Sequence, residues 1–167
     1  MIDGKLPTAL AQYAREVDHI AIAVKDLDEA LHWYERVLGF ELLGRRTTHG
    51  ARTSMHSAVL RAGPITFVLT QGTSPEDQVS RFMAVHGAGV THVALRVQNL
   101  RAVAAEFEAA GGRFATSLLE CPGLLQLFTE RDPLSGMMVE LIQRDGGNFT
   151  DQSVERVFRD MEASNHY

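Results

Sequence analysis

The feature that most constrains the fold is an internal repeat. Residues 18–40 align without a gap with residues 91–113, at an offset of 73 positions. The identical residues pair as His19 with His92, Ala21 with Ala94, Val24 with Val97, Leu27 with Leu100, Glu35 with Glu108 and Gly39 with Gly112. Self-similarity of this kind indicates two copies of one supersecondary unit that bury their apolar faces together. We therefore predict a duplicated fold.

Each copy has the pattern of a strand, a helix and then three strands. In the first copy the apolar run 17–24 is typical of a strand, and over 27–38 the apolar residues change to helical spacing. Short stretches bounded by turn residues then indicate further strands. These stretches are 40–47, 54–61 and 65–71 in the first copy, and 113–118, 124–130 and 137–143 in the second. The sequence predicts βαβββ twice.

Capping residues mark the boundaries of the repeated helices. Asp26 followed three residues later by Glu29 matches a capping box at the start of the first helix. Gly39 and the pair Gly111-Gly112 lie where helices end, since glycine adopts the left-handed conformation of a C-terminal cap. We expect both helices to lie between these signals.

Two further helices complete the expected architecture. Ser74 and Pro75 offer an N-cap and a first helical residue for a helix that connects the modules. The last helix has an apolar stripe and could fold back over the mouth of the cup. We predict one α+β domain over residues 1–167, a cup-shaped mixed sheet with helices outside and a C-terminal lid helix. Its segments are module one at about 17–72, the connecting helix at about 75–87, module two at about 90–143 and the closing helix at about 150–164.

Charge and hydropathy exclude some classes of partner. The net charge is −5, from 16 basic and 21 acidic residues, and no basic run is long enough to follow a phosphate backbone, so we expect no nucleic acid. A run of about 18 apolar residues, which a membrane helix needs, is missing. The N-terminal stretch 1–18 lacks a basic start followed by an apolar segment. We expect a soluble cytoplasmic protein.

Three residues are candidates for metal ligands. Side chains alternate along a strand, so His19 and His92 project from the face opposite their apolar neighbours. Glu140 is surrounded by Met, Val, Leu and Ile, which is costly for a carboxylate unless a cation pairs with it. Two imidazoles and one carboxylate on equivalent strands are the ingredients of a facial triad with about three open coordination positions. We predict a metal site at the base of the cup.

The first module supplies no second carboxylate. At an offset of 73, Glu140 corresponds to Phe67, and the stretch 65–70 contains no Asp, Glu or His. Gln71 is near enough to serve as an amide ligand. Three protein ligands suit an open site that a substrate can chelate.

These residues and segments resemble the vicinal-oxygen-chelate superfamily of glyoxalases, bleomycin-resistance proteins and dioxygenases, whose fold is the paired βαβββ. More narrowly, the chain resembles the catalytic C-terminal half of 4-hydroxyphenylpyruvate dioxygenase and hydroxymandelate synthase. The matching stretches are HGAGVTHVAL at 86–95, LLQLFTE at 124–130, MVELIQR at 138–144, GGNF at 146–149 and the closing helix. The resemblance covers nearly the whole chain.

The resemblance implies roles for particular residues. His19, His92 and Glu140 correspond to the ligands of ferrous iron. The substrate pocket would be lined by Ser57, Gln78, Gln126, Phe128 and Phe149, with the two glutamines orienting a polar ring substituent and the two phenylalanines packing the ring. The chain departs from the family at Thr91, where Gln is expected, and at Met138, which replaces an aromatic residue. The family's additional N-terminal domain has no counterpart here, so the aryl end of the substrate is where we expect differences.

The leading hypothesis is a non-haem iron(II) dioxygenase. A 2-oxo acid, of the arylpyruvate kind, would chelate the metal, dioxygen would take the remaining position, and oxidative decarboxylation would accompany hydroxylation of the same substrate. Manganese, cobalt and zinc are alternative metals. Because ligand histidines must be neutral, metal affinity should fall below about pH 6.5.

Two other classes stay open. The first is a metal-dependent isomerase, lyase or extradiol dioxygenase of the same fold, although a missing second carboxylate disfavours the glyoxalase type. The second is a metal-free protein that sequesters a drug or another small molecule in the cup. A homodimer through exposed sheet edges is compatible with either class.

Overall fold

The computed structural model describes residues 9–164. Its strands are β1 (Ala14–Ala23), β2 (Glu41–His49), β3 (Ser54–Ala62), β4 (Ile65–Gly72), β5 (Gly89–Val97), β6 (Leu119–Cys121), β7 (Leu124–Phe128) and β8 (Met138–Arg144). Its helices are α1 (Ala9–Tyr13), α2 (Leu27–Leu31) with the π-helical continuation η1 (His32–Val37), α3 (Gln78–His86), α4 (Leu100–Ala109) and α5 (Asp151–Ser164). The prediction for the N-terminal stretch rests partly on residues 1–8, which lie outside the described range.

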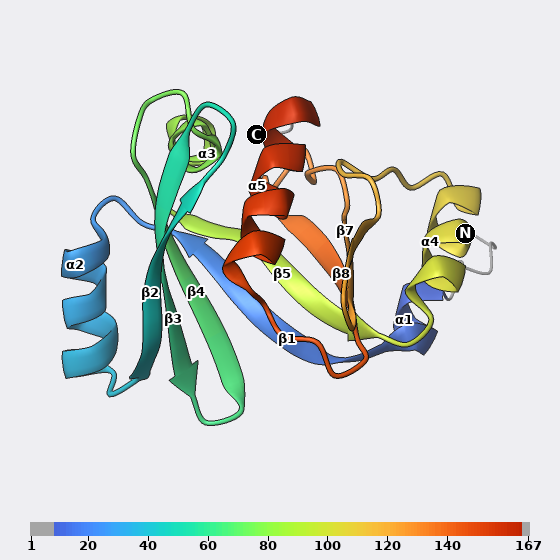
Figure 1. The fold of residues 1–167 in the computed structure, drawn as a ribbon, viewed down its shortest axis with the longest axis horizontal. Coiled ribbons are helices and arrows are strands. Elements are labelled where there is room, and N and C mark those ends of the chain that lie inside the picture. Colours follow the sequence, from blue (N-terminus) through green and yellow to red (C-terminus); the bar gives the residue numbers. More distant parts are fainter. Residues whose placement is uncertain (1–8, 165–167) are drawn as a thin grey trace, which may run out of the picture.

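All eight strands form one mixed sheet in the order β2-β3-β4-β1-β5-β8-β7-β6. The central strands β1 and β5 are antiparallel, β4 and β8 run parallel to them, and the outer pairs are antiparallel. Each half therefore repeats the other about an axis between β1 and β5. The sheet curls, with α2 outside one half and α4 outside the other (Figure 1). The predicted α+β class and the paired βαβββ pattern are confirmed.

The outer helices are held by apolar clusters on the convex side of the sheet. Leu27 and Leu31 of α2 pack on Leu60 and Leu69, and all four side chains are buried. An equivalent cluster lies under α4 and contains Val97, Leu100, Val103, Leu127 and Leu141. Burial of such side chains is the main favourable term in folding. Because these clusters occupy the convex face, the concave face is left for polar and ligand-binding groups.

The two modules share a contact at their helix starts. Gln71 Oε1 accepts a hydrogen bond of 2.7 Å from Leu27 N, and Gln143 Oε1 accepts one of 2.8 Å from Leu100 N. Both glutamines thus satisfy a backbone donor in the first turn of a helix. The suggestion that Gln71 is a metal ligand is therefore wrong, because its amide oxygen belongs to the start of α2.

The register of the last strands corrects one sequence pairing. Ala21 on β1 pairs with Val68 on β4, and the equivalent Ala94 on β5 pairs with Glu140 on β8. The structural counterpart of Glu140 is therefore Val68, at an offset of 72, and not Phe67. One residue fewer separates β5 from β8 than separates β1 from β4. The conclusion that the first module supplies no carboxylate stands.

Two predicted boundaries were wrong. The connecting helix begins at Gln78, because the Asp77 carboxylate accepts from both Ser80 N and Ser74 N, at 2.8 Å each, and so makes residue 77 the N-cap. The expected strand 113–118 is reduced to a single bridge at Phe114, and the short β6 begins only at residue 119.

Side-chain contacts explain why the stretch after Phe114 leaves the sheet. Thr116 Oγ1 accepts from Phe128 N at 3.1 Å, where a ladder partner would otherwise be. Ser117 N donates to Asp160 of α5 at 3.1 Å. By contrast, Asp26 is the N-cap of α2, because its Oδ1 accepts from Glu29 N at 2.8 Å, which is one of the two bonds of the predicted capping box. The glycines at residues 39 and 111 are left-handed, as predicted.

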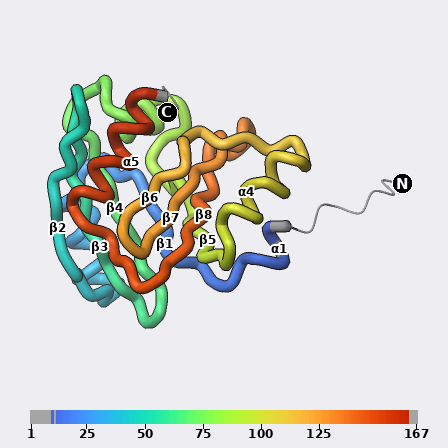
Figure 2. The backbone as a smooth tube through the Cα atoms, turned by 45° about the vertical axis from the view of Figure 1, so that its right-hand side comes forward, coloured from blue at the N-terminus to red at the C-terminus, as the bar shows by residue number. Residues whose placement is uncertain are grey.

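Helix α5 closes the open side of the curled sheet. It contacts both edge strands, β2 and β6, and Figure 2 shows it crossing between them. The buried Glu162 carboxylate accepts from Ala51 N at 2.7 Å and from Thr53 N at 2.9 Å, and a Cβ at Gly50 would lie 2.6 Å from that carboxylate. Gln78 Nε2 donates to Phe158 O at 2.8 Å. These contacts fasten α5 to the first module.

Candidate metal centre

Three side chains from neighbouring central strands meet on the concave face. His19 lies on β1, His92 on β5 and Glu140 on β8. The two Nε2 atoms are 3.2 Å apart, and Glu140 Oε2 lies 3.2 Å from His19 Nε2 and 3.5 Å from His92 Nε2. The structure brings together the three residues that the sequence predicted as metal ligands.

The separations within this triad suit a divalent transition metal. Bonds of about 2.1 Å to nitrogen and oxygen place neighbouring ligand atoms about 3.0 Å apart at right angles. Within residues 9–164, no other group of three His, Cys, Asp or Glu residues has ligand spacing. Three ligands on one face leave the remaining positions open toward the cavity. The donor set, two imidazoles and one carboxylate, fits iron(II) as well as manganese, cobalt or zinc.

The second oxygen of Glu140 is held by Gln126. Gln126 Nε2 on β7 donates to Glu140 Oε1 at 2.8 Å, and both side chains are almost fully buried. This contact leaves Oε2 directed at the histidines. Gln126 was predicted to bind substrate, and the structure shows that one of its amide protons is used on a ligand.

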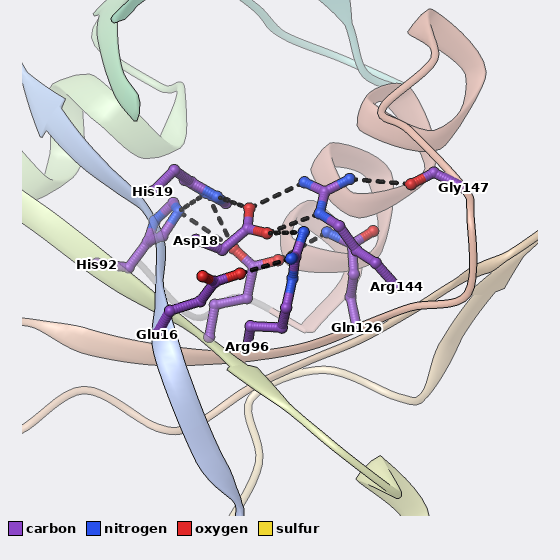
Figure 3. Close-up of polar contacts among 9 residues, drawn as sticks. Glu16, Asp18, His19, His92, Arg96, Gln126, Arg144 and Gly147 are labelled. Carbon is purple, nitrogen blue, oxygen red and sulfur yellow. Dashed lines mark hydrogen bonds and ion pairs between the residues drawn. The ribbon is translucent and has the colours of Figure 1, made fainter. Parts of the chain in front are cut away.

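The first histidine has an ionic support of its own. His19 Nδ1 lies 3.0 Å from Asp18 Oδ1, and Arg144 grips Asp18 through Nε at 2.6 Å and Nη2 at 2.9 Å (Figure 3). Arg144 Nη1 also donates to Gly147 O at 3.1 Å. A carboxylate on Nδ1 selects the tautomer whose Nε2 lone pair is free for a metal. The sequence analysis did not predict this contact between Asp18 and His19. The one feature of the sequence that points to it is an acidic residue directly before His19.

We expect Asp18→Asn to weaken metal binding by about 10–100-fold, the usual cost of losing an outer partner of a ligand histidine. The measurement is a competitive chelator titration with cobalt(II). Glu16→Gln, an exposed change on the same strand, is the control. Since Asn also leaves Arg144 without its partner, urea unfolding must show a folded protein. Unchanged affinity in folded Asp18→Asn would refute a supporting role.

Without a metal, the two imidazoles and the carboxylate of the triad shift one another's pKa values. Burial alone would lower the pKa of His19, but Glu140 and Asp18 outweigh it and raise that pKa to about 9. Burial lowers the pKa of His92 to about 4. Burial would raise the pKa of Glu140, but the nearby His19 holds it below its ordinary value. A metal would take the place of the His19 proton, so we expect proton competition to begin above the pH inferred from sequence.

The triad lies at the base of a cavity of about 170 Å³ beneath α5. A cavity of roughly 150 Å³ holds a benzene-sized molecule, so this one suits a small metabolite. All five residues predicted to bind substrate line it, namely Ser57, Gln78, Gln126, Phe128 and Phe149. Phe128 meets the ring of His92 edge-on at 5.3 Å, and Phe149 meets His19 at 5.5 Å. Their contacts with substrate stay predictions.

Sequence reasoning also missed two arginines in the cavity wall. Arg46 on β2 and Arg131 after β7 both line the cavity. Arg46 Nη1 and Arg131 Nε are buried without a hydrogen-bond partner in the described part of the chain. Thr91 and Met138, the two residues that depart from the family pattern, also line the cavity. Thr91 Oγ1 donates to Ala21 O at 3.3 Å, and Met138 is buried.

Comparison with known proteins agrees with this architecture. The model of the Glyoxalase/Bleomycin resistance protein/Dioxygenase superfamily matches residues 16–141, well over half of the chain. The chain belongs to this superfamily. All three residues of the triad lie within the matched range, and the predicted superfamily is confirmed.

Two curated relatives are much longer than this chain. A 4-hydroxyphenylpyruvate dioxygenase of Coccidioides posadasii is 32% identical over 110 residues, which are 58% of this chain and 27% of the relative. An uncharacterized protein, slr0090, of Synechocystis is 28% identical over 103 residues, which are 59% of this chain and 30% of that protein. The chain thus spans less than a third of the length of these relatives.

Solved structures show the fold. A mutant 4-hydroxymandelate synthase of Streptomyces coelicolor matches with a TM-score of 0.77 at 19% identity, over 91% of this chain and 54% of that chain. Methylmalonyl-CoA epimerase of Mycobacterium tuberculosis matches with a TM-score of 0.65 at 23% identity, over 79% of this chain and 89% of that chain. At these identities the likeness concerns architecture alone.

Within the superfamily fold, the candidate ligands of this chain are distributed unequally between the modules. Each module gives one histidine, but the second alone gives a carboxylate, and Val68 occupies the equivalent position in the cavity wall. Among the described residues, no helix has both the length and the apolar character needed to cross a bilayer.

Proposed function

We propose that this protein binds iron(II) at His19, His92 and Glu140 and is an oxygenase that acts on a small 2-oxo acid. The observation that carries the proposal is the three-ligand site at the base of a cavity with a free coordination face. The similarity to 4-hydroxyphenylpyruvate dioxygenase supports it. The overall reaction would join both atoms of dioxygen to the substrate carbon skeleton and release carbon dioxide.

The chain's own residues would bind, orient and shield the substrate. Iron(II), when bound, supplies the one-electron chemistry that dioxygen requires and accepts the 2-oxo acid as a chelate. Gln126 fixes the Glu140 carboxylate, and Asp18 fixes the His19 ring. Phe128 and Phe149 lie edge-on to the imidazoles of His92 and His19 and cover part of each ring. Helix α5 covers the cavity through Val157 and neighbouring apolar residues.

An isomerase or epimerase is the second candidate, favoured by the fold shared with methylmalonyl-CoA epimerase. Moving a proton at carbon requires a general base within reach of the substrate. Among the described residues that line the cavity, the only carboxylate and the only imidazoles are those of the triad, and the other ionisable groups are arginines. This composition favours chemistry supplied by the metal over proton abstraction by a free side chain.

The test is a titration of anaerobic iron(II)-loaded protein with phenylpyruvate and 4-hydroxyphenylpyruvate. We expect a saturable visible charge-transfer band, absent in Glu140→Ala and retained in Glu130→Gln, which changes a half-buried acid that is paired with Arg113 and does not line the cavity. Product analysis under oxygen should then show carbon dioxide and a hydroxylated acid. If iron bound but no 2-oxo acid gave a band, the result would favour an isomerase, a lyase or an extradiol dioxygenase of the same fold. Failure to bind iron would favour sequestration of a small molecule.

A further inference from the structure

Arg131 is a cation in the cavity wall that the proposed function leaves without a role. It follows β7, and its Nη1 donates to Gly136 O at 2.8 Å and to Thr91 O at 3.3 Å. The guanidinium lies over the ring of Phe82, 4.9 Å from its centroid. These contacts hold the group in one orientation beside the cavity.

Within residues 9–164, the other edge of this guanidinium has no acidic partner. Nε is buried without a hydrogen-bond partner, and Nη2 makes no hydrogen bond within the described residues. Burial lowers the pKa of Arg131 to about 10, which leaves it charged at neutral pH. A partly buried charge without a counterion is costly, because no carboxylate compensates for the hydration that it has lost.

Arg144 shows what is missing at Arg131. Both arginines donate from Nη1 to a backbone carbonyl, and both lie over a phenylalanine ring, since Arg144 is 4.5 Å from the centroid of Phe149. In Arg144 the Nε and Nη2 edge holds the Asp18 carboxylate in a two-point contact. That edge matches the spacing of two carboxylate oxygens. In Arg131, no carboxylate of the described residues binds the equivalent edge formed by Nε and Nη2.

The charge of the cavity favours a ligand with more than one negative group. Glu140 is the only acid among the described lining residues, and it already contacts the two histidines and Gln126. Arg46 adds a second guanidinium, which forms an ion pair at 3.4 Å with the exposed Asp151 at the start of α5. A divalent metal at the triad would leave the cavity with excess positive charge. Such a cavity selects anions through its field as well as through contacts.

We propose that Arg131 binds a second carboxylate of the substrate, so that the substrate class is a 2-oxo dicarboxylic acid. This inference rests on the proposed function, in which the first carboxylate and the keto oxygen chelate the metal. The chelating carboxylate already has the metal as its counterion, whereas the second needs one. The apolar surroundings of Arg131, with Phe82 and Met138 in the same wall, strengthen such a charged pair.

The experiment compares ligands that differ only in the second carboxylate. Anaerobic iron(II)-loaded protein is titrated with 2-oxoglutarate against 2-oxopentanoate, and with 2-oxoadipate against 2-oxohexanoate, by calorimetry and by the visible band. We expect at least one diacid to bind about ten-fold or more tightly than its monoacid, the range for a charged two-point contact. In Arg131→Gln that ratio should fall to within about two-fold. Arg131→Lys, which keeps the charge without the fork, should give an intermediate ratio.

The ratio is taken within each variant, so a partial loss of folded protein cancels. Arg101→Gln, which removes an exposed arginine on α4, should keep the wild-type ratio. Wild-type protein without a preference for either diacid, or an unchanged ratio in Arg131→Gln, would overturn the inference. Calorimetry with glutarate against pentanoate needs no chelation. If no 2-oxo acid gave a band but glutarate still bound in an Arg131-dependent way, the role of Arg131 would hold and the oxygenase proposal would fail.

Discussion

Glu140→Gln is expected to abolish tight metal binding while the fold persists. Glutamine has nearly the same volume and can still accept the hydrogen bond from Gln126 Nε2, which is 2.8 Å from Glu140 Oε1. It lacks the negative charge that offsets a divalent cation in a fully buried position. Loss of an outer partner of a ligand costs about 10–100-fold in affinity, so loss of the only anionic ligand should cost more than about 100-fold.

The measurement is metal content after equilibrium dialysis against iron(II) under nitrogen, repeated with cobalt(II) for its visible spectrum. Glu120→Gln makes the same chemical change on β6, where the side chain is exposed, and should bind metal like the wild type. Urea unfolding of both variants checks the fold. Near-stoichiometric metal in Glu140→Gln would show that the triad is not the metal site, and the oxygenase proposal would fall with it.

The positions of the two histidines could be predicted because strand alternation and the repeat are patterns that the sequence itself shows. His19 and His92 align at the offset of 73, and β1 and β5 do pair as antiparallel centre strands. Alternation then sets which face each side chain occupies. The same reasoning found Glu140, since a carboxylate in an apolar strand needs a partner.

What the sequence could not show depends on contacts between distant residues. Asp18 and Arg144 are 126 positions apart, and the sequence around each residue does not predict that they form a two-point ion pair. The start of α3 moved to Gln78 because the Asp77 carboxylate reaches back to Ser74 N. The strand expected at 113–118 does not form, because Ser117 N donates a hydrogen bond to Asp160 of α5 instead of to a neighbouring strand. In each case a side-chain hydrogen bond overrides the backbone preference.

The divergence of the two modules explains why the site has an open side. Ala21 and Ala94 are equivalent, but their neighbours across the sheet are Val68 and Glu140. A duplicated carboxylate would have added a fourth ligand from the opposite wall. Valine instead leaves that wall apolar, so a small ligand could approach a metal at the triad from the first module, beneath α5. The extension of one domain over all 167 residues, and a homodimer, stay predictions.

Metal binding should stabilise the folded protein strongly, because the three ligands converge only in the native state. At a free metal concentration of 100 times Kd, linkage gives about 2.7 kcal/mol of added stability. For a chain of this length, 1 kcal/mol moves Tm by about 2–4 °C, so we expect a rise of about 5–10 °C. Differential scanning fluorimetry with cobalt(II) or zinc(II) measures this shift.

The variant His19→Ala decides whether such a shift comes from the triad. It removes the ligand that contacts Glu140 at 3.2 Å, so its Tm should not respond to metal, whereas His32→Ala, an exposed histidine on η1, should respond like the wild type. Addition of a chelator should return the wild type to its starting Tm. A metal-induced shift that survived in His19→Ala would mean that the ion binds elsewhere. Absence of a shift in the wild type at saturating metal would favour the metal-free sequestration alternative, because binding to the native state alone must raise its stability.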